Sequence, residues 1–349
     1  MEFFAFSAKR IAEILLCKIG KNIRKGMLIR MKIEKLSPAF KDYLWGGTKL
    51  RDVYGKKCDY DKVAESWELS THPAGQSVIS GGEYDGLTLS AYLEKAGKQA
   101  LGANCAQFEN FPVLIKFIDA KEPLSIQVHP SDEYALRVEH EYGKTEMWYV
   151  MDCEPGASLY FGVNRPVTKE EFRQKIEDNT VLDVLNKVDV HPGDVFFIES
   201  GTIHAIGAGI MICEIQQNSN TTYRVYDYAR RGADGKLREL HVDKALDVSR
   251  FTPSDTSDRQ GDAETVSGGT RKPLASCKYF TTEKYTVDGS VLLHADEGSF
   301  VSLIVTEGSG LVKGAENELA VKAGDSLFVP AGAGKVEVTG TCTFIKTTV

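Results

Sequence analysis

Short runs of apolar residues, either alternating with polar residues or uninterrupted, recur along most of the chain. Runs of roughly four to eight such residues predict strands, because alternate side chains of a strand lie on opposite faces of its sheet. The clearest runs predict the following strands: residues 112–118, 144–151, 157–163, 194–199 and 211–217. Helical spacing predicts helices over 87–102 and 181–186, and a capping box, Thr168 with Glu171, predicts the start of a third. The chain is therefore predicted to be mainly β.

The last hundred residues differ in composition from the rest. Residues 252–273 are rich in serine, threonine, glycine and proline, which is typical of a connector. Residues 274–349 are almost entirely short strand-like runs separated by Gly and Asp, a pattern that favours a sandwich or barrel. Residues 321–330 resemble residues 188–198, since both read as a strand, a Gly-Asp turn and an apolar strand. We therefore predict two jelly rolls, in 31–251 and 274–349, related by internal duplication.

The overall composition is that of an ordinary globular protein. A chain of 349 residues can bury one large core or two modest ones. Its formal net charge of −7 gives no support for nucleic-acid binding, which requires a basic surface. The seven cysteines are scattered, odd in number and without a CxxC pair. This usage fits reduced thiols in a cytoplasmic protein better than a disulfide framework.

The first thirty residues are basic and differ in pattern from the rest of the chain. Their apolar run, Ile11–Ile19, contains Glu13 and Lys18 and is too short to span a bilayer. It also lacks a clear small-residue cleavage site, so we predict neither a signal peptide nor a membrane partner. Met31 immediately precedes the first strand-like run. We interpret Met31 as the natural start and residues 1–30 as an extension outside the fold, with an amphipathic surface helix as the alternative.

One predicted strand carries side chains that suit a metal ion. In the run that begins at Ser125, Gln127 and His129 share its face, whereas the intervening isoleucine and valine lie on the other face and require a core. Glu146 and His204, from two later strand-like segments, complete a candidate set of ligands. A strand histidine is more often structural, but two imidazoles, a carboxylate and an amide oxygen together suit a zinc-like ion with room for water or substrate.

Other polar residues interrupt apolar strands and suggest a pocket. Glu214 opens a run of alternating polar and apolar residues that continues to Arg224, an arginine suited to an anion. The alternative is a hairpin with a solvated face. Lys116 interrupts an aliphatic strand, where a buried charge requires a partner, unless it is an edge lysine with its amine in water. Lys116 and Ser125 near a metal would suit a phosphate, and the lack of a glycine-rich nucleotide loop favours a sugar phosphate.

Six segments of the chain match one known family. They are Tyr43–Gly46, Glu68–Pro73, Phe111–Lys116, Leu124–Pro130, Lys144–Tyr149 and Gly201–Ala205. Through them the chain resembles the short bacterial form of type I mannose-6-phosphate isomerase. The resemblance covers most of residues 31–250 and, more loosely, the C-terminal jelly roll. It implies a cupin fold for both jelly rolls, a bound zinc ion and aldose–ketose isomerisation.

The resemblance also implies roles for individual residues. One zinc ion per chain is expected on four ligands: Gln127, His129, Glu146 and His204. The active-site arginine of the family falls on Arg224, with Glu214 ten residues before it. Lys144 matches a family lysine proposed to assist catalysis, and the phosphate-binding positions fall on Lys116 and Ser125.

Two departures from the family pattern are evident. Longer members carry a large helical insertion that this chain lacks. They also have an aspartate in the segment before the arginine, where this chain has Asn220. A proton-transfer role for that position is therefore in doubt.

We expect a zinc-dependent enzyme that interconverts mannose 6-phosphate and fructose 6-phosphate through a cis-enediol. The base stays open between Glu214, Lys144 and zinc-bound water. One alternative is a non-catalytic metal-binding cupin that senses sugar phosphate, but a sensor needs neither Lys144 nor Arg224. Another is a metal-dependent oxygenase with iron, which the phosphate-binding candidates and the amide ligand disfavour. We expect a monomer or weak homodimer.

Overall fold

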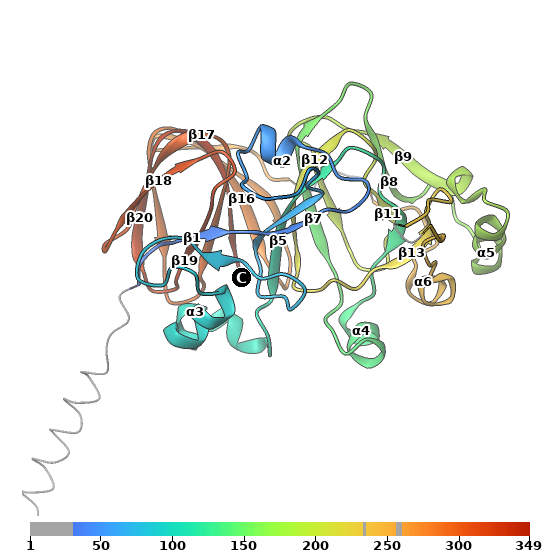
Figure 1. Ribbon diagram of the computed structural model, residues 1–349, viewed down its shortest axis with the longest axis horizontal. Helices are drawn as coiled ribbons and strands as arrows, with labels where there is room; N and C mark the ends of the chain where they lie inside the picture. The colour runs from blue at the N-terminus through green and yellow to red at the C-terminus, as the bar shows by residue number, and fades with distance from the viewer. Residues whose placement is uncertain (1–30, 233–234, 256–259) are drawn as a thin grey trace, which may run out of the picture. The chain divides into compact units, whose positions relative to one another are not determined.

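The computed structural model describes residues 31–232, 235–255 and 260–349. Within Lys32–Val349, which form one compact unit, antiparallel sheets make up most of the structure (Figure 1). The prediction of a mainly β chain with two cupin-type jelly rolls and a few helices is confirmed. The predicted extension over residues 1–30 lies outside the described residues.

The first jelly roll is a sandwich of two sheets. One sheet has the order β10-β7-β12-β5-β3-β2, with these bounds: β2 (Ala39–Lys41), β3 (Glu65–Leu69), β5 (Val113–Ala120), β7 (Glu146–Cys153), β10 (Val195–Ile198) and β12 (Ile210–Gln217). The other has the order β13-β6-β11-β8-β9: β6 (Ile126–Val128), β8 (Ser158–Val163), β9 (Leu185–Asp189), β11 (His204–Ala205) and β13 (Tyr223–Tyr226). Buried side chains from both sheets, among them Trp148, Ile212 and Phe161, pack together in the core between them.

Helices cover the outer face of the five-stranded sheet. Ile126 and Val128 of β6 pack there against Phe172 of α5 (Lys169–Glu177) and Leu246 of α6 (Val242–Val248). The predicted helix start at Thr168 is confirmed, because the Thr168 hydroxyl accepts a hydrogen bond from the Glu171 amide at 3.0 Å. The Glu171 carboxylate pairs with Arg165, so only the threonine half of the predicted capping box is observed. None of the described helices has both the length and the apolarity that a membrane crossing requires.

The other helices are short. The helix predicted over 87–102 is limited to α3 (Leu89–Ala96), because the chain turns at Gly97 with φ of 80°. The segment predicted as helix over 181–186 is a single 3₁₀ turn, η3 (Val181–Val184), that leads into β9. The remaining short helices are α2 (Lys49–Asp52), α4 (Asp132–Val138), η1 (Lys98–Ala100) and η2 (Ala103–Gln107).

The second jelly roll is built on a nine-stranded sheet. Its strands from the end of the chain are β14 (Glu264–Val266), β15 (Gly269–Ser276), β16 (Thr281–Ala295), β17 (Val301–Lys313), β18 (Glu318–Lys322), β19 (Ser326–Val329) and β20 (Gly334–Thr348). The segment predicted as a connector thus contains β14 and the start of β15, joined by a turn at Gly268, whose φ is 79°. Two strands come from the start of the described chain: β1 (Glu34–Ser37) pairs with β19, and β4 (Val78–Ile79) pairs with β1.

The two similar Gly-Asp segments adopt the same turn. Gly193 and Gly324 have φ values of 96° and 93°, which favour glycine. The aspartate that follows each glycine accepts a hydrogen bond from the amide three residues before it, at 2.8 Å for Asp194 and 2.9 Å for Asp325. The repeat seen in the sequence is therefore a repeat of local structure.

A buried ion pair lies where the two jelly rolls meet. The Lys56 ammonium lies 2.6 Å from the carboxylate of Glu68 on β3, and it also donates to the carbonyl oxygen of Gly324. Ser326 of β19 donates from its hydroxyl to the Glu68 carbonyl oxygen at 3.0 Å. Both charged side chains are buried, and burial raises the pKa of Glu68, against the opposing effect of Lys56. The contact therefore depends on both charges.

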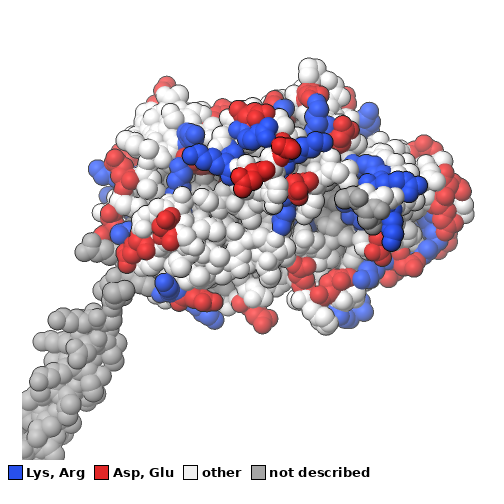
Figure 2. Space-filling model, viewed as in Figure 1, with Lys and Arg blue, Asp and Glu red and all other residues white. Residues whose placement is uncertain are grey.

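On the face shown in Figure 2, basic and acidic side chains are interspersed along the upper part, and a largely uncharged area lies below them. Neither sign of charge forms a continuous field on that face.

Replacement of Lys56 by Met should destabilise the protein strongly, because the Glu68 carboxylate would stay buried without its partner. We expect a loss of about 3–5 kcal/mol in the free energy of unfolding, measured by denaturant titration. Lys35→Met is the control, because Lys35 and Asp325 form a partly exposed pair at 2.7 Å. That change should cost less than about 1 kcal/mol. Similar losses for both variants would contradict the importance of the buried pair.

Candidate metal centre and active site

Candidate metal ligands from both sheets of the first jelly roll meet in its interior. His204 on β11 pairs in register with Gln127 on β6, and Glu146 begins β7 in the opposite sheet. Glu146 Oε1 lies 3.3 Å from His204 Nε2, and Oε2 lies 3.6 Å from His129 Nε2. The Gln127 amide nitrogen lies 3.4 Å from His204 Nε2. Rotation of that amide group by about 180° exchanges its nitrogen and oxygen and so places the oxygen beside His204.

Backbone carbonyls fix the orientation of both imidazole rings. Nδ1 of His129 lies 2.9 Å from the Thr221 oxygen, and Nδ1 of His204 lies 2.8 Å from the Thr202 oxygen. Since a carbonyl only accepts, each Nδ1 carries the proton and donates it, which leaves each Nε2 as an acceptor. Nε2 of His129 lies 3.1 Å from the Lys144 ammonium. Burial lowers the pKa of His204 to about 4, so its ring is neutral at neutral pH. Burial also lowers the pKa of His129, with Lys144 as the second cause.

The carboxylate of Glu146 completes a set that fits a divalent ion. Both of its oxygens are buried, and Oε2 lies 2.6 Å from the Lys144 ammonium. Burial raises its pKa above the ordinary value, whereas a divalent cation beside it would favour the ionised form. The nearest atoms of His129, Glu146 and His204 all lie within 4.8 Å of one another. Two neutral imidazoles and a carboxylate suit a zinc-class ion.

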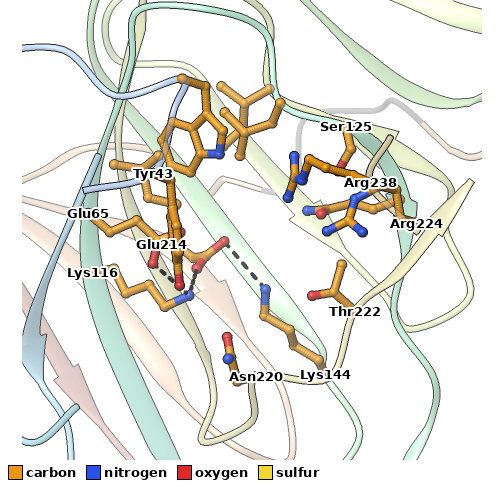
Figure 3. A pocket seen from close by; sticks show the side chains of 15 residues that line it. Tyr43, Glu65, Lys116, Ser125, Lys144, Glu214, Asn220, Thr222, Arg224 and Arg238 are labelled. Carbon is orange, nitrogen blue, oxygen red and sulfur yellow. Dashed lines mark ion pairs between the residues drawn. The ribbon is translucent and has the colours of Figure 1, made fainter. Parts of the chain in front are cut away.

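A row of alternating charges leads from these ligands into a pocket (Figure 3). Lys144 lies 2.6 Å from Glu146 and 3.7 Å from Glu214, and Lys116 lies 3.2 Å from Glu214 and 3.6 Å from Glu65. Burial raises the pKa of Glu214, but Lys116 and Lys144 outweigh that effect and lower it below its ordinary value. The pKa of Lys116 is raised by Glu214 and Glu65 despite its burial. Glu214 is therefore ionised and Lys116 charged at neutral pH.

The opposite end of the pocket carries arginines. The pocket has a volume of about 280 Å³. In Figure 3, Ser125, Arg224 and Arg238 lie together, away from Glu65 and Lys116. Arg224 Nη1 donates to the Glu239 carbonyl oxygen at 2.7 Å, while its buried Nε has no hydrogen-bond partner among the described atoms. Arg238 lies 3.2 Å from the carboxylate of Asp227, which is buried and also pairs with Arg230. Arg230 and Arg238 therefore share one carboxylate, and Arg224 adds a further positive charge at this end of the pocket.

The structure brings every predicted site residue to the metal cluster or to the pocket beside it. Those in the pocket wall are Lys116, Ser125, Gln127, Lys144, Glu214 and Arg224. Lys116 and Ser125, predicted to act together on a phosphate, lie at different ends, and Lys116 is already paired with two carboxylates (Figure 3). Asn220 also lines the pocket.

Sequence reasoning missed two charged residues of the pocket wall, Glu65 and Arg238. Glu65 lies two positions before Trp67, whose indole nitrogen donates to it at 2.7 Å, so strand alternation beside a matched segment could have indicated it. Arg238 follows β13 in a polar segment with no periodic pattern, and no signal in the sequence indicates it.

A double jelly roll with a buried group of two histidines and a glutamate defines a cupin protein with a candidate metal centre. Comparison with known proteins narrows the class. Residues 33–154 match the family model for the catalytic domain of type I phosphomannose isomerase, and residues 270–349 match that for the cupin domain of mannose-6-phosphate isomerase.

Two relatives and one solved structure agree with these matches. Mannose-6-phosphate isomerase ManA of Bacillus subtilis is 40% identical over 87% of this chain and 94% of its own. Mannose-6-phosphate isomerase of Streptococcus mutans is 38% identical over 82% of this chain and 89% of its own. The crystal structure of mannose 6-phosphate isomerase from Bacillus subtilis has a TM-score of 0.84 at 36% identity, covering 91% of this chain and 99% of that one. The chain belongs to the type I mannose-6-phosphate isomerase family, as its motifs predicted, and it is an isomerase.

Purified protein should contain about one zinc-class ion per chain, and His204→Ala should contain little or none, because it removes one of the buried nitrogen ligands. Elemental analysis measures both. His191→Ala is the control, since the His191 side chain is 80% exposed and lies outside the cluster. A His204→Ala protein with full metal content would show that the ion is held elsewhere.

Proposed function

We propose that this protein is a zinc-dependent isomerase that interconverts mannose 6-phosphate and fructose 6-phosphate through a cis-enediol. The observation that carries the proposal is a single pocket that joins three kinds of group. Gln127 belongs to the candidate metal centre, Lys144 and Glu214 are charged groups next to it, and Ser125 and Arg224 offer an anion site. Together they supply what an aldose–ketose isomerisation of a phosphorylated sugar uses: polarisation of the sugar oxygens, proton transfer and binding of the phosphate.

The buried charges suit proton transfer between adjacent carbons. When bound, the metal would polarise the sugar oxygens as a Lewis acid. Glu214 is ionised and can accept a proton, and Lys144 lies 3.7 Å from it in the same buried site. We assign the transfer to Glu214 and Lys144 together, because the two charged groups are neighbours beside the candidate metal ligands and both line the pocket. Lys116 keeps Glu214 ionised from its other side.

The two arginines have different neighbours, which supports different roles. Arg224 on β13 pairs in register with Gln127, so it lies next to a candidate ligand. We propose that it stabilises the negative charge that develops on the enediol oxygens. Arg238 lies with Ser125 at the end of the pocket where positive charge is in excess. We propose that Ser125 and Arg238 bind the phosphate, and that Lys116 supports the proton-transfer pair instead of the phosphate that the sequence predicted for it.

The cysteines within the described residues are free, which supports the proposed cytoplasmic location. The expectation of a monomer or weak homodimer stays a prediction.

A coupled assay tests the reaction directly. The protein should convert mannose 6-phosphate to fructose 6-phosphate, lose that activity on treatment with a chelator, and regain it with added zinc, because the ligands fit a divalent ion. The same assay with glucose 6-phosphate is the substrate control. Metal-loaded protein that binds the sugar phosphate without converting it would instead indicate a sensor.

Comparison of phosphorylated and free mannose locates the phosphate. Loss of a charge-assisted contact in Arg238→Gln should lower kcat/KM for mannose 6-phosphate by about tenfold to a hundredfold. Residual activity on mannose should change little. Lys116→Met should reduce turnover of both sugars in proportion, because it perturbs Glu214.

Arg231→Gln is the control for Arg238→Gln, because Arg231 is an exposed arginine that donates to the nearby Gly235 oxygen. If Lys116→Met lost activity on mannose 6-phosphate alone, Lys116 would be the phosphate-binding residue, as the sequence predicted.

A further inference from the structure

One carboxylate outside the pocket connects the two halves of the candidate metal centre. Asp132 begins α4, three residues after His129. Its Oδ1 accepts hydrogen bonds from the Gly143 amide at 2.9 Å and from Gln217 Nε2 at 2.8 Å. Its Oδ2 accepts one from the Tyr279 hydroxyl at 2.8 Å. None of the functions assigned above uses Asp132.

Two of these partners lead directly to the start of β7. Gly143 immediately precedes Lys144, which contacts Glu146. Gln217 ends β12, and its Oε1 accepts a hydrogen bond from the Thr145 amide at 2.8 Å. Thr145 is the residue between Lys144 and Glu146. Asp132 and Gln217 therefore hold both amides, at positions 143 and 145, that flank the Lys144 backbone.

The backbones of these two segments are also in direct contact. The Lys144 amide donates to the Pro130 carbonyl oxygen at 2.9 Å. A Cβ atom at Gly143 would lie 2.4 Å from the Asp132 amide nitrogen, closer than any side chain allows. Glycine is therefore required for the approach that lets Asp132 reach the Gly143 amide. The loop after His129 and the residues before Glu146 form one rigid contact.

The third partner comes from the second jelly roll. Tyr279 lies between β15 and β16, and its ring centroid is 6.3 Å from that of Phe108. Its hydroxyl connects the second jelly roll to Asp132, and through Asp132 to the segments that carry His129 and Glu146. The distances from Glu146 to His129 and to His204, across the two sheets, depend on how these segments are held.

We propose that Asp132 is a positioning residue that fixes Lys144 and Glu146 relative to His129, and that Tyr279 makes the second jelly roll part of this support. The inference rests on the proposed function for its catalytic meaning. The hydrogen-bond network itself is independent of metal and substrate. Replacement of residues that hydrogen-bond to metal-binding segments commonly changes metal affinity by about tenfold to a hundredfold. The second jelly roll would therefore support the active site through Tyr279.

Hydrogen–deuterium exchange tests the network without reference to activity. Tyr279→Phe removes one hydroxyl, and exchange of the peptide spanning residues 143–147 should become about fivefold to tenfold faster, because local opening loses a hydrogen bond. Tyr285→Phe is the matched control, since the Tyr285 hydroxyl contacts Glu283 within the second jelly roll. Equal exchange of that peptide in Tyr279→Phe and wild type would overturn the role of Tyr279.

A second set of variants tests Asp132. Asp132→Ala should accelerate the same exchange on the order of tenfold or more, and Asp132→Asn, which keeps an accepting oxygen, should restore part of the protection. Tyr279→Phe should add little to Asp132→Ala, because the hydroxyl acts through the carboxylate. Additive effects of the two substitutions would contradict the proposal. If the alanine variant does not fold, Asp132→Asn replaces it in this comparison.

Release of metal to a chelator separates this inference from the proposed function. Wild type that holds metal, with release about tenfold to a hundredfold faster in Asp132→Ala, supports the positioning role. Wild type that holds no metal would contradict the proposed metal centre, while the exchange measurements would still decide the role of Asp132. Unchanged exchange and unchanged release in Asp132→Ala would overturn the inference alone.

Discussion

The site depends on the compensation of charge that is buried between the two sheets of the first jelly roll. Glu146, Glu214 and Glu65 alternate with Lys144 and Lys116 over contacts of 2.6 to 3.7 Å. In such a poorly hydrated interior an unpaired charge costs several kcal/mol, on the order of a large part of the stability of a domain. The row is therefore stable only as a whole. It has one carboxylate more than lysines, and one of its two terminal carboxylates, Glu146, lies among the candidate metal ligands.

The same charges divide the pocket into two regions with different chemistry. At one end each lysine already has carboxylate partners, so its charge acts on Glu214 and Glu146 before it acts on a ligand. At the other end Arg224 and Arg238 lie with the hydroxyl of Ser125, and Arg238 shares the buried carboxylate of Asp227 with Arg230. A dianionic phosphate suits the second region and reacting carbons suit the first. The lysines and the arginines therefore differ in how far their charges are buried and paired with carboxylates, more than in their residue type.

The second jelly roll is joined to the first through contacts that reach the active-site segments. Strand β1 pairs with β19, the Lys56–Glu68 pair lies where the jelly rolls meet, and Tyr279 contacts Asp132. Each contact ends on a strand or loop that leads to the pocket: Glu68 lies on β3 with Glu65, and Asp132 follows His129. The two jelly rolls therefore form one structural unit around the site, and a change at their junction can reach the metal ligands.

The features that could be predicted from the chain alone are local ones. The period of two in the Ser125–His129 run placed Gln127 and His129 on one face and Ile126 on the other, where it packs against α5 and α6, because alternation is a property of any extended chain. The helix start at Thr168 was equally local. The candidate metal ligands and the family were also predicted from short motifs, and the family is confirmed. These features survive in the fold because they need no information about distant residues.

The meeting of distant residues, in contrast, was set by the way the strands pair and the sheets pack. This packing placed Glu65 and Arg238 in the pocket, paired Lys116 with two carboxylates, joined β1 to the second jelly roll, and brought the Tyr279 hydroxyl to Asp132 across 147 positions of sequence. Each of these contacts depends on the register of paired strands and on how two sheets pack. Register shifts by one residue reverse which face a side chain occupies, and the local pattern of hydrophobic residues does not encode the partner strand.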